Sequence, residues 1–364
     1  MKALAIHAGP KALAHIREHG LRAQDIAVIP AAAGGPKGLI FQKMDQWLFG
    51  SWLPSAPRER TLIGASIGAW RMAAACQPDP VAAFERLGDL YCGQRYPRRP
   101  SAAHISSACR ALLADFVGEH ADQIASHPHH RLQILVSRGR RLLKAPRRNL
   151  SVSAGFGLAV LGNLLSRSQL AHHLARVVVS DERDPAFWLK ARFDAFDTQF
   201  APLSGANLAD ALLASGTLPF TMEPVRALAG APDGTYWDGG LIDYHLALPY
   251  SRLAGKPDGG LVLYPHFGTQ IVPGWLDKTL PWRRAHIGRN SSWLDNVVLL
   301  SPTTAFLQTL SRSKLPDRND FLYYGLNHDF RILNWKLAMG EGARLRDDLA
   351  EFIAKPDPAR VQPL

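Results

Sequence analysis

Three short, glycine-bearing motifs in this 364-residue chain contain residues that can carry out chemistry. In chain order they are Gly-Gly-Pro-Lys-Gly at 34–38, Gly-Ala-Ser-Ile-Gly at 64–68 and Asp-Gly-Gly at 238–240. Together they offer amide groups that can bind an oxyanion, a serine hydroxyl, and a carboxylate that can accept the proton of that hydroxyl. A set of this kind supports nucleophilic attack on an acyl carbonyl.

The second motif fits G-x-S-x-G and makes Ser66 the candidate nucleophile. Residues 61–63 are typical of a strand and residues 67–76 of a helix, so the serine falls at a strand-to-helix turn. Such a turn needs small residues, here Gly64 and Gly68, to hold the hydroxyl clear of the backbone. A glycine-rich chain also produces this pattern by chance, and Ser66 is then an ordinary small residue at a helix start.

The first motif is a candidate oxyanion hole. It follows an apolar strand at 26–29 and opens a helix over 40–48, so its amides lie near a helix N-terminus. Pro36 has no N–H, which leaves the amides of Gly34, Gly35 and Lys37 as donors. The alternative is a plain Gly-Pro turn. The spacing differs from that of a phosphate-binding P-loop and from the full G-x-G-x-x-G dinucleotide motif.

The third motif supplies a candidate base. Asp238 follows a predicted strand at 235–237, where its carboxylate can reach a serine hydroxyl. Asp-Gly is also a frequent turn dipeptide. Asp243, five residues further on, is a second candidate for the same role or for supporting the turn.

Strand and helix patterns alternate along the chain. Further strands are predicted at 132–136, 176–179 and 261–264, and further helices from Pro10 to a stop at Gly20, at 208–215 and at 341–354. This alternation predicts an α/β fold with a mostly parallel central sheet flanked by helices.

The three motifs, in this order, resemble those of the patatin-like phospholipase family. That family has a G-G-G-x-[KR]-G loop, a G-x-S-x-G serine and a DGG or DGA aspartate. Here Ala33 replaces the first glycine of the loop. Residues 211–220 (ALLASGTLPF) are similar to the family's A-S-x-A-x-P segment, with a departure at Gly216-Thr217. The resemblance covers about residues 25 to 245.

This resemblance implies a three-layer α/β fold and a Ser66–Asp238 dyad that works without histidine, cofactor or metal. It selects Asp238 over Asp243. The implied activity is that of a phospholipase A or esterase-like serine hydrolase, which acts on lipid esters through an acyl-enzyme.

Several alternatives remain open. A catalytically silent lipid- or membrane-binding protein could keep the same fold, and an acyltransferase could use the same dyad. A Ser-Asp-His triad of the α/β-hydrolase type would use His266 or His245, because both follow Asp238 in the chain.

For domain organisation, we predict a catalytic domain over 1–270 that includes a basic insertion at about 123–180. A C-terminal extension over 271–364 is expected to pack on this domain.

Positive charge is concentrated in one part of the chain. The 42 Lys and Arg exceed the 31 Asp and Glu, which gives a net charge of +11. Residues 123–180 contain no Asp or Glu but nine basic residues: Arg131, Arg138, Arg140, Arg141, Lys144, Arg147, Arg148, Arg167 and Arg176. This stretch predicts an anionic partner, and the alternative is a solvated basic face.

An anionic membrane surface fits this stretch better than nucleic acid does. The basic run has no interleaved aromatic residues to stack on bases, and no helix-turn-helix or zinc pattern appears. The uncharged segment at 149–166 follows directly and alternates in a strand-like way. We therefore predict docking through 131–148, with Phe156 and Leu158 inserting and with Gly155 and Gly157 giving a mobile lid.

Cysteine content and the N-terminus bear on location. Three sparse cysteines fit a reducing compartment, and charged residues from His7 onward interrupt any signal-peptide apolar core. We predict a cytoplasmic protein that binds membranes peripherally. His127, His129 and His130 lack a nearby cysteine or carboxylate at ligand spacing, so no metal site is predicted. The sequence indicates no oligomeric state.

Overall fold

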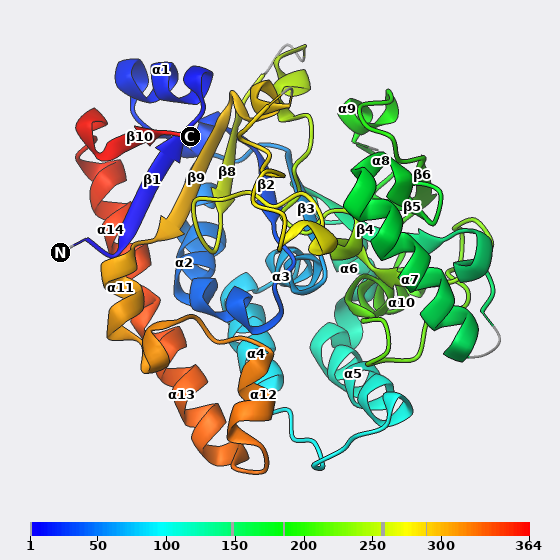
Figure 1. Cartoon of the computed structure of the whole chain (residues 1–364). Helices are drawn as coiled ribbons and strands as arrows, with labels where there is room; N and C mark the ends of the chain where they lie inside the picture. Colours follow the sequence, from blue (N-terminus) through cyan, green and yellow to red (C-terminus); the bar gives the residue numbers. More distant parts are fainter. Residues whose placement is uncertain (1, 147–148, 185, 256–258, 289) are drawn as a thin grey trace.

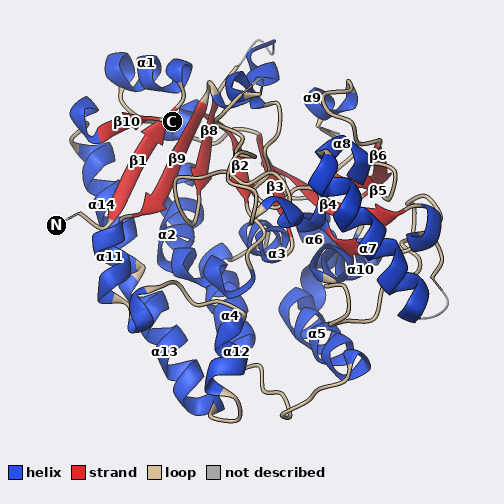
Figure 2. Cartoon of the chain, in the orientation of Figure 1, coloured by secondary structure: helices blue, strands red, loops and turns tan. Residues whose placement is uncertain are grey.

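A ten-stranded, mostly parallel β-sheet forms the middle layer of the computed structural model, and helices cover both of its faces (Figure 1). Figure 2 shows the strands crossing the molecule between the helices. The structure describes residues 2–146, 149–184, 186–255, 259–288 and 290–364. The predicted three-layer α/β architecture is confirmed.

The strands lie in the order β10-β1-β9-β8-β2-β3-β4-β5-β6, and β7 pairs with β4. Neighbours run parallel except for β1 with β9, β4 with β5 and β4 with β7. The bounds are β1 (Leu4–Ala8), β2 (Ile26–Ala31), β3 (Arg60–Ala65), β4 (His130–Gly139), β5 (Leu174–Ser180), β6 (Thr198–Pro202), β7 (Tyr236–Asp238), β8 (Leu261–Pro265), β9 (Val297–Pro302) and β10 (Val361–Pro363).

The helices vary from four to seventeen residues. Their bounds are α1 (Pro10–His19), α2 (Gln42–Trp47), α3 (Ile67–Ala75), α4 (Pro80–Cys92), α5 (Ala102–Val117), α6 (Ala121–Ala125), α7 (Asn149–Leu165), α8 (Arg167–Leu170), α9 (Phe187–Lys190), α10 (Gly205–Gly216), α11 (Thr304–Thr309), α12 (Asn319–Tyr324), α13 (His328–Glu341) and α14 (Ala343–Ala354). None of the described helices is long and apolar enough to cross a bilayer.

The central strands are buried along nearly their whole length because helices cover them on both sides. Strands β3, β5, β8 and β9 are buried at every position, and β4 at all but one. Runs of this kind are typical of parallel sheets. They explain why the sequence predicts β3, β4, β5 and β8 even though their patterns do not alternate, whereas β1, β6, β9 and β10 are absent from the predicted strands.

Strand-and-helix predictions are largely confirmed, with α1 ending before Gly20, whose φ is 72°. The segment at 149–166 is the main error, because α7 is a helix rather than an extended chain. Its buried residues Gly155, Phe156, Ala159 and Asn163 recur every three or four positions, which is helical spacing. The small residues between them created the false alternation.

The acid-free stretch 123–180 is part of the sheet, contrary to the expectation of an insertion. It contains both β4 and β5, which pair with each other. Two of its basic residues are buried: Arg131 pairs with Glu59, and Arg176 pairs with Asp194 and Asp243 at 2.7 Å each. The side chains of Arg147 and Arg148 lie outside the described residues.

The C-terminal part also reaches the sheet. Strand β9 lies between β1 and β8, and β10 forms one edge beside β1 (Figure 1). Helix α13 contacts the 3₁₀ turn Gly35–Phe41, with Trp335 packed in the same buried cluster as Leu39. The boundary at 270/271 stays a prediction, but residues after it support the first glycine motif.

Candidate active site

Ser66 occupies a sharp, strained turn between β3 and α3. Its φ and ψ are 56° and −131°, a conformation that residues with a side chain rarely adopt. A Cβ on Gly64 would lie 2.5 Å from the Ala69 nitrogen, and one on Gly68 would lie 1.9 Å from the Ala31 oxygen. Both glycines are therefore required by close backbone approach, as a nucleophile elbow requires.

Strand register brings the motifs to one edge of the sheet. In the parallel pair β2–β3, Ala31 lies opposite Gly64, so the glycine turn and the elbow leave neighbouring strands at the same level. Strand β4 continues beyond β3 and pairs there with the antiparallel β7, with Val136 opposite Asp238. Asp238 thus reaches the elbow from the opposite direction.

The Ser66 hydroxyl donates a hydrogen bond to Asp238, with 2.8 Å between Oγ and Oδ2. Both residues are 3% exposed. The other carboxylate oxygen, Oδ1, accepts from the Gly240 amide at 2.7 Å. The aspartate is therefore held on both sides, with one oxygen fixed by its own turn and the other directed at the serine.

Ser215 holds the elbow from beneath. The Ser66 amide donates to Ser215 Oγ at 2.8 Å, and that hydroxyl donates to the Leu135 carbonyl at 2.7 Å. Ser215 is fully buried at the end of α10. The segment at 211–220 could be matched by sequence, but this role of its serine depends on a contact across the fold.

The electrostatic setting of Asp238 suits a base. Burial raises the pKa of its carboxyl group, while Arg318, the Ser66 hydroxyl and the Gly240 amide each partly offset that rise in pKa. The Arg318 Nη2 atom lies 3.9 Å from Asp238 Oδ2, the oxygen that faces the serine. A raised pKa makes a carboxylate a stronger proton acceptor.

The glycine turn offers free amides beside the dyad. Gly35 has φ 57°, and a Cβ on Gly34 would lie 2.5 Å from the Phe267 ring, so both positions favour glycine. Within the described residues, the amides of Gly34 and Gly35 donate no hydrogen bond to another protein group, and Lys37 follows in the first turn of the 3₁₀ segment Gly35–Phe41. The structure thus places the three predicted donors in one turn, with Gly34 and Lys37 lining a pocket.

Other candidate residues are used elsewhere. Asp243 makes a bidentate pair with Arg176, at 2.7 and 2.9 Å. The His245 and His266 rings lie 4.2 Å apart and bond to the Gln270 and Gly268 carbonyls. In the described part of the chain, neither imidazole bonds to Ser66 or Asp238.

The three cysteines and the histidines at 127–130 were also considered as possible functional residues. All three cysteines are free and buried. His127 stacks on His130 at 4.3 Å, and burial lowers the pKa of His130 to about 3. The described residues contain no group of three or more His, Cys, Asp or Glu side chains suited to a metal ion.

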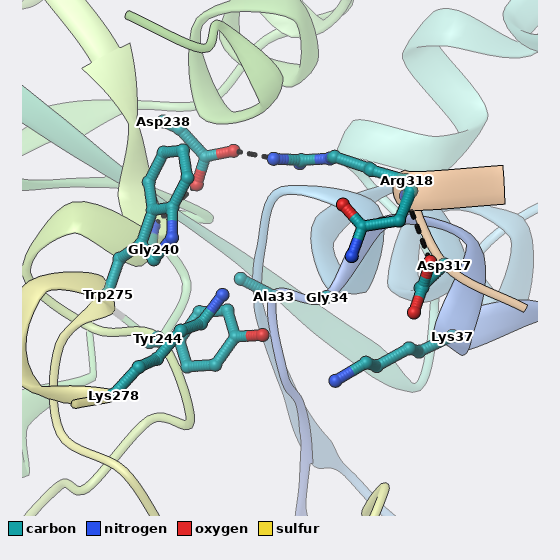
Figure 3. A pocket seen from close by; sticks show the side chains of 11 residues that line it. Ala33, Gly34, Lys37, Asp238, Gly240, Tyr244, Trp275, Lys278, Asp317 and Arg318 are labelled. Atoms are coloured by element: carbon teal, nitrogen blue, oxygen red, sulfur yellow. Dashed lines mark hydrogen bonds and ion pairs between the residues drawn. The ribbon is translucent and has the colours of Figure 1, made fainter. Parts of the chain in front are cut away.

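A pocket of about 310 Å³ opens beside Asp238 (Figure 3). One wall carries residues of the sequence motifs, and the other carries residues that sequence reasoning missed. The lining residues are Ala33, Gly34, Lys37, Asp238, Gly240, Tyr244, Trp275, Lys278, Asp317, Arg318 and Asn319. Those after position 270 belong to no recognisable motif, so no local signal pointed to them.

The chain was compared with protein-family models, curated proteins and solved structures. No family model matches the sequence, and no curated protein matches it significantly. Among solved structures, the chain is similar to VipD from Legionella pneumophila, with a TM-score of 0.32 and 14% identity. The match covers 74% of this chain and 54% of VipD, so the chain corresponds to about half of that protein. The function must be inferred from the geometry of the site.

Proposed function

We propose that this protein is a serine acyl hydrolase that acts on lipid esters with a Ser66–Asp238 dyad, as in patatin-like phospholipases. The observation that carries the proposal is the 2.8 Å hydrogen bond from Ser66 Oγ, on a strained elbow, to Asp238 Oδ2. The free amides of the glycine turn support it. The motifs that resemble the family contribute to one site.

The chemistry follows from these positions. Asp238 takes the Ser66 proton while Oγ bonds to the ester carbonyl carbon, and the carbonyl oxygen becomes an oxyanion near the amides of 34–38. Collapse expels the alcohol, which takes the proton from Asp238. Water then attacks the acyl-enzyme and gives a proton to Asp238. The bond between Oγ and the acyl carbon breaks, Oγ takes the proton back from Asp238, and the carboxylic acid leaves. Removal of one oxyanion-hole donor typically lowers kcat by about 10²–10³-fold. Because Pro36 has no N–H, the amides of Gly34, Gly35 and Lys37 are the ones that can stabilise the oxyanion.

Hydrolysis of a soluble nitrophenyl ester and of phospholipid vesicles tests this proposal. Asp238→Asn should abolish turnover, because the serine loses its proton acceptor, while His245→Ala and His266→Ala should retain most of it. Large losses in either histidine variant would favour the triad. Failure of the wild-type protein to hydrolyse or transfer any acyl group would leave a lipid-binding protein of this fold.

We further propose that the enzyme is cytoplasmic and docks on anionic bilayers through one face of α7. This α7 face consists of exposed apolar side chains, which are Leu150, Leu158, Leu161 and Leu165, and Leu142 is exposed in the preceding 3₁₀ turn Arg141–Leu143. Leu150 and Leu165 are 77% and 84% exposed. A helix with such a face suits the boundary between headgroups and acyl chains.

Positive charges beside the α7 face suggest the partner. Arg140, Arg141 and Lys144 are exposed in the segment that packs against α7. Each cation near an anionic surface contributes about 1 kcal/mol. Arg131, at the start of the predicted docking segment 131–148, is buried and cannot contact a membrane, so the proposed contact is limited to the later, exposed cations of that segment.

The expected insertion points also change. Phe156 is 6% exposed and packs edge-on against Trp237 at 5.2 Å, so it belongs to the core, whereas Leu158 remains on the surface. Gly155 lies tight on Leu143, where a Cβ would approach to 2.6 Å, and this contact argues against a mobile lid at that point.

Co-sedimentation with vesicles tests the docking. Binding should require anionic lipid, weaken with salt, and fall sharply when Leu161 and Leu165 are both changed to Asp. The matched control changes Leu333 and Leu337, which are exposed on α13, to Asp. Equal losses in both variants, or binding that ignores anionic lipid, would contradict this docking face.

A further inference from the structure

We propose that the pocket beside the dyad binds an anionic group of the substrate, a phosphate or carboxylate, through Lys37, Lys278 and Arg318. The inference rests on the proposed function only in taking that group to belong to the acyl ester. It assigns recognition to two residues, Lys278 and Arg318, that lie outside the motif-bearing region.

The three cations come from separate segments and converge on one space. Lys37 lies in the 3₁₀ turn after β2, Lys278 between β8 and β9, and Arg318 just before α12. Figure 3 shows Lys37 and Lys278 on opposite sides of the pocket, with Arg318 extending toward Asp238. Packing requirements of the core do not explain this arrangement, because all three side chains reach solvent-accessible space.

Charge in the pocket is not balanced by its own carboxylates. Asp317 pairs with Lys314, a residue outside the lining, at 3.0 Å. Asp238 is bonded to Ser66 and Gly240, with Arg318 at 3.9 Å. Among the described residues, neither Lys37 nor Lys278 has a carboxylate within 4.0 Å. The pocket therefore holds three cations and two carboxylates, of which Asp317 also pairs with Lys314 and Asp238 takes part in the proposed reaction.

Aromatic faces hold these cations without neutralising them. The Lys278 ammonium lies 4.1 Å from the centre of the Tyr244 ring and 5.3 Å from that of Trp275, and the Arg318 guanidinium lies 5.7 Å from Trp275. Such contacts attract a cation but leave its charge in place. The charges therefore stay available to an incoming anion.

Burial lowers the pKa of both lysines, and repulsion by the other pocket cations lowers that of Lys278 further. Partial burial, with Lys37 and Arg318 nearby, lowers the pKa of Lys278 to about 8, although Asp238 opposes the shift. Burial also lowers the pKa of Lys37, with Lys314 lowering it further and Asp317 opposing. An anion between these groups would relieve the repulsion and favour their charged forms.

The size of the pocket places the anion close to the reacting carbonyl. A volume of about 310 Å³ is at the lower end for small-molecule sites, and the same space is bordered by Asp238 and Gly34. An ester and an anionic group can share it only when few bonds separate them. A phosphate on the glycerol next to the scissile ester meets this condition.

Two soluble substrates that differ only in the anion provide the test. These are dihexanoylglycerol phosphate and dihexanoylglycerol, each kept below its aggregation limit so that no membrane is involved. Hydrolysis is measured for the wild-type protein, and binding by calorimetry for Ser66→Ala, with inorganic phosphate as a third ligand. A charge-assisted contact supports a preference of about tenfold or more for the phosphate compound.

Variants assign the preference to the pocket. Lys278→Met and Arg318→Met should each reduce it about tenfold, and Arg318→Lys should retain part of it. The control Lys355→Met removes an exposed charge outside the pocket and should leave the preference unchanged. Melting temperatures verify that each variant is folded.

The outcomes separate this proposal from the hydrolase itself. Equal binding and hydrolysis of the two compounds, or a preference that survives Lys278→Met, overturns the anion site while the hydrolase stands. A preference in Ser66→Ala binding without any wild-type turnover supports the site and overturns the hydrolase. Inorganic phosphate that binds as tightly as the ester would indicate a free-phosphate site and overturn the assignment to substrate.

Discussion

The two walls of the pocket are built in different ways. The reactive wall, with Asp238 and the glycine turn, stands at the ends of β2 and β7, and Asp238 is hydrogen-bonded to Ser66 at the end of β3 and to the Gly240 amide. The cationic wall, with Trp275, Lys278 and Arg318, lies in connecting segments, and its side chains are partly exposed. A rigid sheet therefore holds the reacting groups, while loops carry the groups that we expect to select the substrate.

Breaking the elbow should have the largest effect on the reactive wall. Gly68→Ala would place a Cβ 1.9 Å from the Ala31 oxygen, so β2 and α3 would have to separate. We expect destabilisation of about 3 kcal/mol or more, with loss of activity. Gly157→Ala is the matched control, since its Cβ would meet nothing within 4 Å. Chemical denaturation measures both, and a stable, active Gly68→Ala would contradict the elbow.

The motifs of the reactive wall could be found by sequence because each is a local pattern next to a strand or a turn. Strands 26–29 and 61–63 were likewise predictable from their apolar runs, as was the helix that follows Ser66. The cationic wall could not be found. Lys278 and Arg318 reach Asp238 across more than 35 positions of chain, and nothing around them marks a site. The segment that forms helix α7 is predicted to be extended, because the small residues between its buried positions mask the helical spacing.

Two neighbouring aspartates separate catalysis from stability. Asp238→Asn should reduce kcat by about 10³-fold or more while the melting temperature holds or rises, because the buried charge is removed. Asp243→Asn breaks the buried pair with Arg176 and should cost about 3–5 kcal/mol of stability, with activity per folded molecule retained. Activity and thermal unfolding are measured on both. The reverse pattern would exchange the roles of the two residues.

The acid side of the pH profile should link the two walls. Burial raises the pKa of Asp238, and the base works only when deprotonated, so kcat/KM should fall with decreasing pH at a higher pH than for an ordinary aspartate. Arg318 lowers that pKa, so in Arg318→Met the fall of kcat/KM should occur at a still higher pH. If the pH of this fall in kcat/KM stays the same or decreases in Arg318→Met, then Arg318 does not lower the pKa of Asp238.

The alkaline side gives the smallest effect and concerns the cationic wall alone. The pKa of Lys278 is lowered to about 8, and its charge responds to Lys37, Arg318 and Asp238, with the Tyr244 ring beneath it. Preference for the phosphate substrate should decline as pH rises through 8, because the ammonium loses its proton. Lys278→Arg should keep the preference above that pH. If the preference is constant from pH 7 to 9 in the wild-type protein, then Lys278 does not contribute to recognition of the phosphate.

The central claim is that Ser66 is an activated nucleophile, and a fluorophosphonate probe tests it most directly. Mass spectrometry of the labelled protein should find one modified peptide that carries the probe on Ser66. Labelling should vanish in Ser66→Ala, slow greatly in Asp238→Asn, and proceed at the normal rate in His245→Ala and His266→Ala. An unlabelled wild-type protein, or a label on another serine, would contradict the account.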